Sequence, residues 1–356
     1  MISLNRGEWS ELYSILFLLV EPNLKVVDSN LNPVIEAEEL FVLKEIISNS
    51  KVRLRYELID NIIMIFIDDD VFNEMSIEEI RINRNILLDK IKSAKNKTGA
   101  FTIPSLDDFL KKFSNQNNFK TGSNKKNDIE LVLLDKKKNI ETNLTYSIKS
   151  SLGNPATILN SSSNTNFRYK VENLDTAQVN LINKIDTRTK LIDRIKKISE
   201  LGGKIIYDSI PSKIFEYNLK MVDANMPKYL GNALLYSYKM NNKDLKTVFI
   251  KSNEFDDEIM AIKKLGDLVN AISFGFFPGK KWDGKNSVTG GLMIVKDDGN
   301  VCVIDLMYYK DEVQNYLIKE SKLDSPSSTR YHMLELSEED NGNIYFTLNL
   351  QIRYKN

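Results

Sequence analysis

Apolar residues recur at helical spacing in the first part of the chain. Leu12, Ile15, Leu16 and Leu19 fall on one face of a helix over residues 8–20, because residues three and four apart lie side by side on a helix. The same spacing predicts further helices over residues 36–49, 76–95, 105–113, 174–201 and 258–274, and over residues 216–238 with a break near Pro227.

A period of two replaces the helical period near residue 128. Residues 128–134 and 143–150 predict two strands, and the polar stretch 135–140 between them predicts a turn. Similar patterns predict strands over residues 52–58, 62–67, 290–295, 301–306 and 344–354. Helices and strands together predict an α/β (α+β) fold, with a mixed sheet flanked by helices.

The distribution of these elements predicts three parts. Residues 1–170 contain the N-terminal helix and the hairpin and form a core; residues 171–280 are mainly helical; residues 281–356 are a β-rich C-terminal part. The Ser/Asn-rich residues 160–166 have the composition of a linker.

Charge and rare residues exclude several kinds of chemistry. Lys and Arg (49) balance Asp and Glu (49), which counts against a non-specific DNA coat protein but not against basic groups gathered in one cleft. The single cysteine, Cys302, and the single histidine, His332, exclude an intramolecular disulfide and a multi-histidine zinc site, and they make a Ser-His-Asp mechanism improbable. Any metal is therefore expected on carboxylates, which favours Mg²⁺, with Mn²⁺ as a substitute.

No targeting segment is predicted at the N-terminus. The apolar run over residues 12–20 is too short to span a bilayer, and Glu8 and Glu11 stand just before it, where a signal peptide carries positive charge. We therefore expect a cytoplasmic protein without a membrane partner, and the low cysteine content fits that reducing compartment.

The predicted hairpin gathers groups suited to phosphate chemistry. Asp128 and Glu130 share one face of the first strand, and Ser147 and Lys149 share one face of the second. A carboxylate that binds a metal and a cation beside the phosphate are what phosphodiester hydrolysis needs. Each residue alone also fits an ordinary role: Asp128 in a turn, Lys149 reaching out from an exposed face, Glu130 as an exposed strand residue.

Several segments jointly resemble the HpaII family of restriction endonucleases. They keep a plausible order and span nearly the whole chain, over residues 7–11, 147–169, 221–227, 288–291, 322–330 and 348–353. The resemblance implies a nuclease core related to the PD-(D/E)xK enzymes in residues 1–170. It also implies a Type II enzyme that cuts double-stranded DNA at a short palindrome, CCGG in the family's namesake, with magnesium.

The resemblance assigns roles to the hairpin residues. Asp128 and Lys149 are expected in catalysis, with Glu11 or Glu8 supplied by the Gly-x-x-x-Glu segment of the first helix. The PD-(D/E)xK pattern places an acid two residues before the lysine, whereas this chain has Ser147 there, so we expect Glu130 or Glu11 to complete a metal site with Asp128. At the helix N-terminus, Glu8 and Glu11 are also simply favourable for helix stability.

DNA contacts are expected from the Ser/Asn-rich stretch and from basic loops, because arginine and lysine read guanine and asparagine reads adenine. The candidates are Asn160, Asn166, Arg168, Lys281, Lys285 and Arg330. The charges Arg194, Lys196 and Lys197 on a predicted helix are expected to form a solvated face instead.

A palindromic target also implies a homodimer on DNA, and a restriction system implies a cognate DNA methyltransferase. Two other interpretations stay open. One is a DNA-binding protein on a nuclease fold that has lost catalysis, motivated by Ser147. The other is a structure-specific resolvase or repair nuclease on the same core, which would cut branched DNA regardless of sequence.

Overall fold

The computed structural model describes residues 1–37, 39–49, 53–94, 99–114 and 126–355. Contacts divide the chain into two compact units. Unit 1 comprises residues 1–156 and 286–316, and unit 2 comprises residues 157–285 and 317–355. Unit 2 thus begins where the chain leaves unit 1 after the predicted hairpin, and the chain returns to unit 1 at residue 286.

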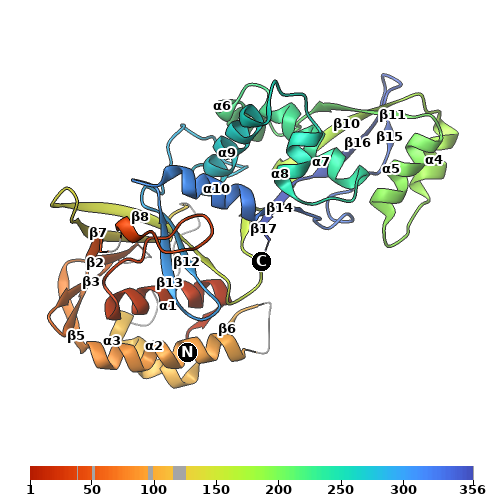
Figure 1. The fold of residues 1–356 in the computed structure, drawn as a ribbon. Coiled ribbons are helices and arrows are strands. Elements are labelled where there is room, and N and C mark those ends of the chain that lie inside the picture. The colour runs from red at the N-terminus through yellow and green to blue at the C-terminus, as the bar shows by residue number, and fades with distance from the viewer. Residues whose placement is uncertain (38, 50–52, 95–98, 115–125, 356) are drawn as a thin grey trace. The chain divides into compact units, whose positions relative to one another are not determined.

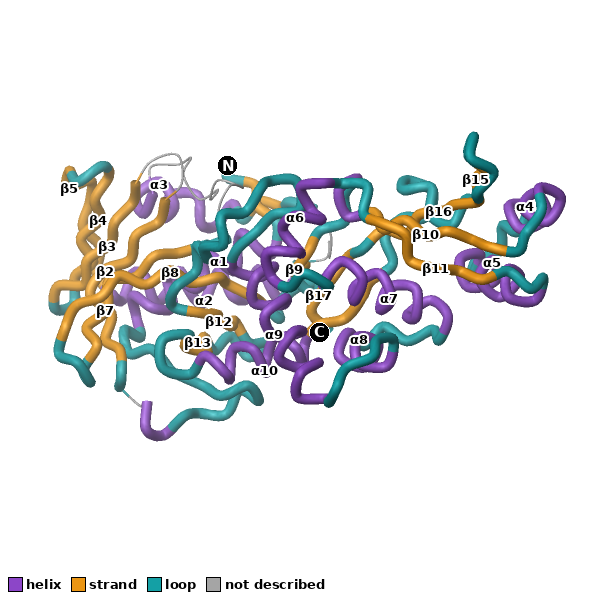
Figure 2. Tube along the Cα trace, turned by 90° about the horizontal axis from the view of Figure 1, so that it is seen from above, coloured by secondary structure: helices purple, strands orange, loops and turns teal. Residues whose placement is uncertain are grey.

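Unit 1 is built on an eight-stranded mixed sheet, which confirms the expected mixed α/β fold. The strand order is β13-β12-β8-β7-β2-β3-β4-β5; β12 and β8 run parallel and the other pairs run antiparallel. Figure 2 shows β7, β2, β3, β4 and β5 side by side. The strands are β2 (Phe41–Asn49), β3 (Arg53–Ile59), β4 (Ile62–Ile67), β5 (Asp70–Ser76), β7 (Ile129–Asp135), β8 (Ile140–Ser150), β12 (Gly291–Val295) and β13 (Val301–Asp305).

Three helices of unit 1 pack with this sheet, and Figure 1 shows them together beside its strands. They are α1 (Arg6–Val20), α2 (Ile77–Ser93) and α3 (Asp107–Ser114), and a two-stranded sheet of β1 (Ser3–Leu4) and β6 (Phe101–Thr102) completes the unit. Helix α1 begins at a capping box in which Asn5 and Glu8 each accept a hydrogen bond from the other's backbone N–H. Its remaining turns are mostly apolar, and most of their side chains are buried.

Unit 2 has two smaller antiparallel sheets, ordered β11-β10-β16-β15 and β14-β17-β9. Its strands are β9 (Thr157–Leu159), β10 (Asn166–Glu172), β11 (Lys204–Ser209), β14 (Ser321–Asp324), β15 (Ser337–Glu338), β16 (Ile344–Asn349) and β17 (Gln351–Tyr354). Its helices are α4 (Thr176–Asn183), α5 (Lys190–Glu200), α6 (Lys213–Val222), α7 (Met226–Lys239), α8 (Leu245–Lys251) and α9 (Glu258–Phe274). Tyr169 stacks on Phe346 with ring centroids 5.2 Å apart, inside this unit's own core.

The helix predicted over residues 36–49 is wrong. A 3-10 turn covers Ile35–Ala37 and strand β2 follows. A register shift between Leu43 and Glu45 in the pairing with β7 inserts an extra residue into β2. The buried positions therefore fall at Phe41, Leu43 and Ile46, and the last spacing of three imitates a helix.

The single helix predicted over residues 174–201 is two helices, α4 and α5, because partners distant in the sequence stabilise the break. Asn183 exchanges hydrogen bonds of 2.9 and 3.0 Å with the backbone of Leu336. The Arg194 guanidinium donates to the carbonyls of Asn183, Ile185 and Leu334. Arg194 is only 5% exposed, so its predicted place on a solvated face is wrong.

The C-terminal part also differs from the expectation. Helix α10 (Lys310–Glu320) interrupts the β-rich pattern. The contacts assign residues 286–316 to unit 1 and the residues after 316 to unit 2, which differs from a separate part over 281–356. Residues 160–166 are not a linker, because Ser162 caps a 3-10 turn over Ser163–Thr165 that leads directly into β10.

Candidate active site

The β7–β8 hairpin of unit 1 carries the predicted chemistry on one face. Ile129 pairs with Tyr146 and Glu130 pairs with Thr145, so alternate residues of both strands share a face. One face contributes Leu131, Tyr146 and Ile148 to the hydrophobic core that α1 also joins. The opposite face carries Glu130, Ser147 and Lys149. Asp128, two residues before Glu130, lies on this face too, and its backbone extends the ladder because its N–H donates to the Tyr146 carbonyl at 2.9 Å.

Asp128, Ser147 and Lys149 form a continuous hydrogen-bonded chain. The Ser147 hydroxyl donates to Asp128 Oδ2 at 3.2 Å, and Lys149 Nζ donates to the Ser147 Oγ at 2.8 Å. The backbone N–H of Ile148 donates to the same Asp128 Oδ2 at 2.6 Å. Ser147 is only 2% exposed, so its hydroxyl fixes the lysine and the carboxylate relative to each other. The serine in the place of the expected acid is therefore a structural link between the two.

Asp128 retains one oxygen that can bind a cation. Both hydrogen bonds to its carboxylate end on Oδ2, and within the part of the chain that the structure describes Oδ1 accepts none. A carboxylate oxygen of this kind is a suitable Mg²⁺ ligand, since Mg²⁺ is commonly held by one or two carboxylates together with water and substrate phosphate. Asp128 Oδ1 could therefore serve as one ligand of a magnesium ion.

Lys126 is a second cation at this site that sequence reasoning missed. Burial, with a further contribution from the charge of Lys149, lowers the pKa of Lys126 to about 8, although Asp128 acts in the opposite direction. Its backbone N–H donates to Ser287 Oγ at 3.1 Å. The residue closes a polar, lysine-containing stretch in the sequence, and only its position two residues before Asp128 distinguishes it from a solvated loop lysine.

A glycine-containing segment before β12 supports the hairpin. Thr145 Oγ1 donates to the Ser287 carbonyl at 2.8 Å, and the Thr145 N–H donates to Thr289 Oγ1 at 3.1 Å. A Cβ at Gly290 would lie 2.4 Å from the Tyr146 ring, so only glycine lets this segment approach β8 so closely. The segment over residues 287–290 therefore holds β8 in place.

The predicted acids differ in how the structure uses them. Glu130 lies on the same face as Asp128, whereas Glu8 is engaged in the α1 capping box. Glu11 belongs to α1, which packs with the Tyr146 side of the sheet, opposite Lys149. Among the described residues no three acidic, histidine or cysteine side chains are grouped closely enough to hold a metal ion. The structure therefore does not gather Asp128, Glu130 and Glu11 into one cluster.

The residues predicted to contact DNA all belong to unit 2. Asn160, Lys281, Lys285 and Arg330 are exposed, and the Lys281 amine lies 4.6 Å from the centre of the Tyr217 ring.

Two of the predicted contacts are engaged within the protein. Arg168 pairs with Glu339 at 2.8 Å and with Asp208 at 3.6 Å, and it lies over the Tyr345 ring at 3.7 Å. Asn166 Oδ1 accepts a hydrogen bond from Asn349 at 2.7 Å. These two side chains would have to exchange protein partners to reach a base.

The buried cysteine plays the ordinary role of a small apolar residue. Cys302 is 4% exposed, and burial raises the pKa of its thiol to about 11.

No helix in the described part of the chain is long and apolar enough to cross a membrane.

Comparison with known proteins identifies the family. The sequence matches the HpaII restriction endonuclease family over residues 5–354. It is 33% identical to the Type II restriction enzyme HpaII of Haemophilus parainfluenzae, over 98% of each chain. No solved structure matches. The chain belongs to the HpaII restriction endonuclease family.

Proposed function

We propose that the protein is a Type II restriction endonuclease that hydrolyses both strands of DNA with a magnesium ion bound at Asp128. The observation that carries the proposal is the chain of hydrogen bonds from Asp128 through Ser147 to Lys149 on one face of the β7–β8 hairpin. These bonds link a carboxylate to a cation, and this supports the proposal because phosphodiester hydrolysis needs a metal-binding carboxylate and a cation beside the phosphate. The proposal implies a core of the PD-(D/E)xK type in which serine replaces the second acid.

Each hairpin residue then has a distinct task. Asp128 would hold the metal through Oδ1, and Glu130 is a further carboxylate on the same face of the hairpin. Lys149 faces the scissile phosphate, where its charge offsets the negative charge that develops as water attacks phosphorus and the ester bond breaks. Bound Mg²⁺ would polarise the phosphate and lower the pKa of the attacking water. Ser147 keeps the lysine and the carboxylate at a fixed separation.

The substrate assignment rests on the relative. HpaII is a Type II restriction enzyme, and from this likeness we propose a short palindromic target, with CCGG as the first sequence to test. We also propose a homodimer, because a two-fold target matches a two-fold protein, and a cognate methyltransferase that protects the host DNA.

The test is cleavage of a mapped plasmid with Mg²⁺ or Mn²⁺ and sequencing of the ends. Lys149→Ala and Asp128→Asn should fold and bind DNA like the wild type but cut about a hundredfold or more slowly, the scale of losing one transition-state contact. Lys44→Ala is the matched control, because Lys44 is an exposed lysine on β2 of the same sheet. Excess chelator should abolish cleavage.

Two outcomes would contradict the proposal. A folded Lys149→Ala protein that cuts at the wild-type rate would place the active site elsewhere, and full cleavage in chelator would remove the metal. A wild-type protein that binds DNA specifically but never cuts it, with any divalent ion, would make it a DNA-binding protein on a nuclease fold.

A further inference from the structure

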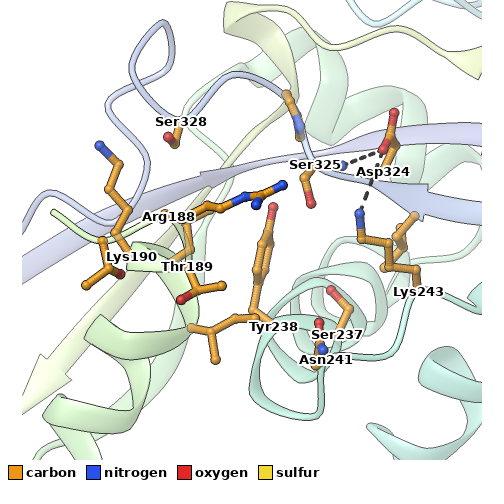
Figure 3. A pocket seen from close by; sticks show the side chains of 15 residues that line it. Arg188, Thr189, Lys190, Ser237, Tyr238, Asn241, Lys243, Asp324, Ser325 and Ser328 are labelled. Atoms are coloured by element: carbon orange, nitrogen blue, oxygen red, sulfur yellow. Dashed lines mark hydrogen bonds and ion pairs between the residues drawn. The ribbon is translucent and has the colours of Figure 1, made fainter.

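A pocket in unit 2 has the chemistry of a phosphate site and has no part in the mechanism above. It encloses about 340 Å³, the lower end of the range for ligand pockets. Its wall comes from three separate segments: the start of α5, the end of α7, and the loop after β14. Figure 3 shows Arg188, Tyr238 and Ser325 converging on it from these segments.

Positive charge exceeds negative charge in the wall of this pocket. Arg188, Lys190 and Lys243 line it together with a single carboxylate, Asp324. Asp324 forms an ion pair with Arg353 at 2.9 Å, so its negative charge is already partly neutralised and offsets the charge of the pocket's cations only weakly. Asn, Ser and Thr side chains make up most of the remaining polar lining.

The three cations of the pocket differ in whether they are already paired with an acidic residue. Lys190 pairs with Asp186 at 3.0 Å, and Lys243 lies 3.9 Å from Asp324. Arg188 forms no ion pair with any described residue, and Figure 3 shows its guanidinium pointing into the pocket. An unpaired guanidinium offers a planar set of N–H donors that matches phosphate oxygens.

The Tyr238 hydroxyl is the second observation that points to a ligand. Tyr238 is only 8% exposed, and its hydroxyl has no hydrogen-bond partner among the described residues. Burial raises the pKa of Tyr238 to about 12, and an interaction with Ser325 acts in the opposite direction. The two hydroxyls nevertheless lie outside hydrogen-bond geometry. Buried hydroxyls without a partner are rare because they lose their hydrogen bonds to water, so a ligand oxygen would satisfy this one.

The acidic residues near the start of α5 do not pair with Arg188 or Tyr238. Asp193 accepts hydrogen bonds from Thr187 and Thr189, and Asp186 is the partner of Lys190. Both carboxylates thus interact with residues of their own segment, so neither occupies the place of an anion beside Arg188 and Tyr238.

We propose that this pocket binds a phosphate ester, with Arg188 as its charged contact and the Tyr238 hydroxyl as its neutral donor. The phosphate belongs either to the DNA backbone or to a free nucleotide. The first alternative rests on the proposed function, since it makes the pocket a contact of the restriction enzyme with its substrate away from the catalytic hairpin.

Two variants separate charge from hydrogen bonding. Arg188→Gln should weaken binding of a short DNA duplex about threefold to tenfold and reduce the slope of log affinity against log salt by about one, as expected for one lost phosphate contact. Tyr238→Phe should weaken binding by a similar factor without changing the salt slope, because it removes no charge. Lys196→Gln is the control, an exposed cation on α5 outside the pocket.

The same variants are titrated with thymidine 5′-monophosphate and with inorganic phosphate by calorimetry. Weaker duplex binding assigns the phosphate to DNA, and weaker nucleotide binding with unchanged duplex binding assigns it to a free nucleotide; both support the site. Unaltered binding of all probes by both variants overturns it. Thermal melting without ligand should not be lowered in Tyr238→Phe, because this hydroxyl has no hydrogen bond to lose, and such a result excludes a folding defect. If the wild type binds no DNA, the proposed function fails, and the nucleotide and phosphate titrations still decide the pocket.

Discussion

Asp305 on β13 is a buried carboxylate whose removal should change the pH dependence of folding. It is fully buried, with Oδ2 accepting the Tyr308 N–H at 2.6 Å and Oδ1 without a hydrogen-bond partner among the described residues. Burial, assisted by the nearby charge of Asp135, raises the pKa of Asp305 to about 6, against hydrogen bonds from backbone N–H groups that lower it. Asp305→Asn keeps the shape and removes the titration.

The magnitude follows from the shift. An aspartate in the unfolded chain has a pKa near 3.8. Between pH 3.8 and pH 6 the carboxyl of Asp305 is therefore mostly ionised in the unfolded state but still mostly protonated in the folded state. The stability contributed by this group is therefore fully present below about pH 3.8 and is lost as pH rises through 6. At 1.36 kcal/mol per pKa unit, the total loss is about 3 kcal/mol, of which about 2 kcal/mol falls between pH 4.5 and pH 7.5.

The assay is urea unfolding of both proteins across this pH range, followed by the fluorescence of Trp9 in a Trp282→Phe background, because Trp9 lies in unit 1 with Asp305. The difference in the free energy of unfolding, variant minus wild type, should rise by about 2 kcal/mol from pH 4.5 to pH 7.5. Asp297→Asn, in an exposed turn of the same β12–β13 hairpin, should show no such rise. Parallel profiles for Asp305→Asn and wild type would refute the reasoning, whatever their offset.

Three further outcomes are expected. Ser147→Ala breaks the link between Asp128 and Lys149 and should slow cleavage about tenfold, the scale of one or two hydrogen bonds, with the metal dependence unchanged; a rate equal to wild type would deny Ser147 a positioning role. Arg330→Ala should weaken binding to a specific duplex more than to a non-specific one, by about 1–3 kcal/mol, and equal losses in a titration would recast Arg330 as a phosphate contact. Sedimentation with a specific duplex should show two chains per DNA, and one chain cutting both strands would indicate sequential nicking by a monomer.

Local sequence patterns were sufficient to predict the two strands on which the candidate site is built. The wrong predictions lie where a β-bulge or a partner distant in the sequence determines the secondary structure. The alternation over residues 128–134 and 143–150 was sufficient for the β7–β8 hairpin. Strand β2 was missed because its bulge gives buried residues at a helical interval. The break between α4 and α5 depends on Leu334 and Leu336, which no local window around residue 185 contains.

The same division holds for the candidate site. The period of two along a strand is sufficient to bring Asp128, Ser147 and Lys149 together, because it decides which side chains share a face. The contribution of Ser147 as a bridge could not be predicted, because it depends on hydrogen-bond distances across the pair of strands. Arg168 looked available for DNA, but Glu339, 171 residues away in the sequence, engages it.

The order of segments in unit 1 has a consequence for how the enzyme is made. Strand β8, which carries Lys149, pairs with β12, yet residues 157–285 of unit 2 are synthesised before the chain reaches residue 291. At ribosomal speeds of about 5–20 residues per second, β8 waits about 7–30 seconds for this neighbour. Throughout that time the segment that contacts Thr145 has not been made, so a nascent or truncated chain lacks two strands of this sheet, β12 and β13. The order of segments in this chain therefore places the completion of the eight-stranded sheet late in synthesis, after residue 295 of 356.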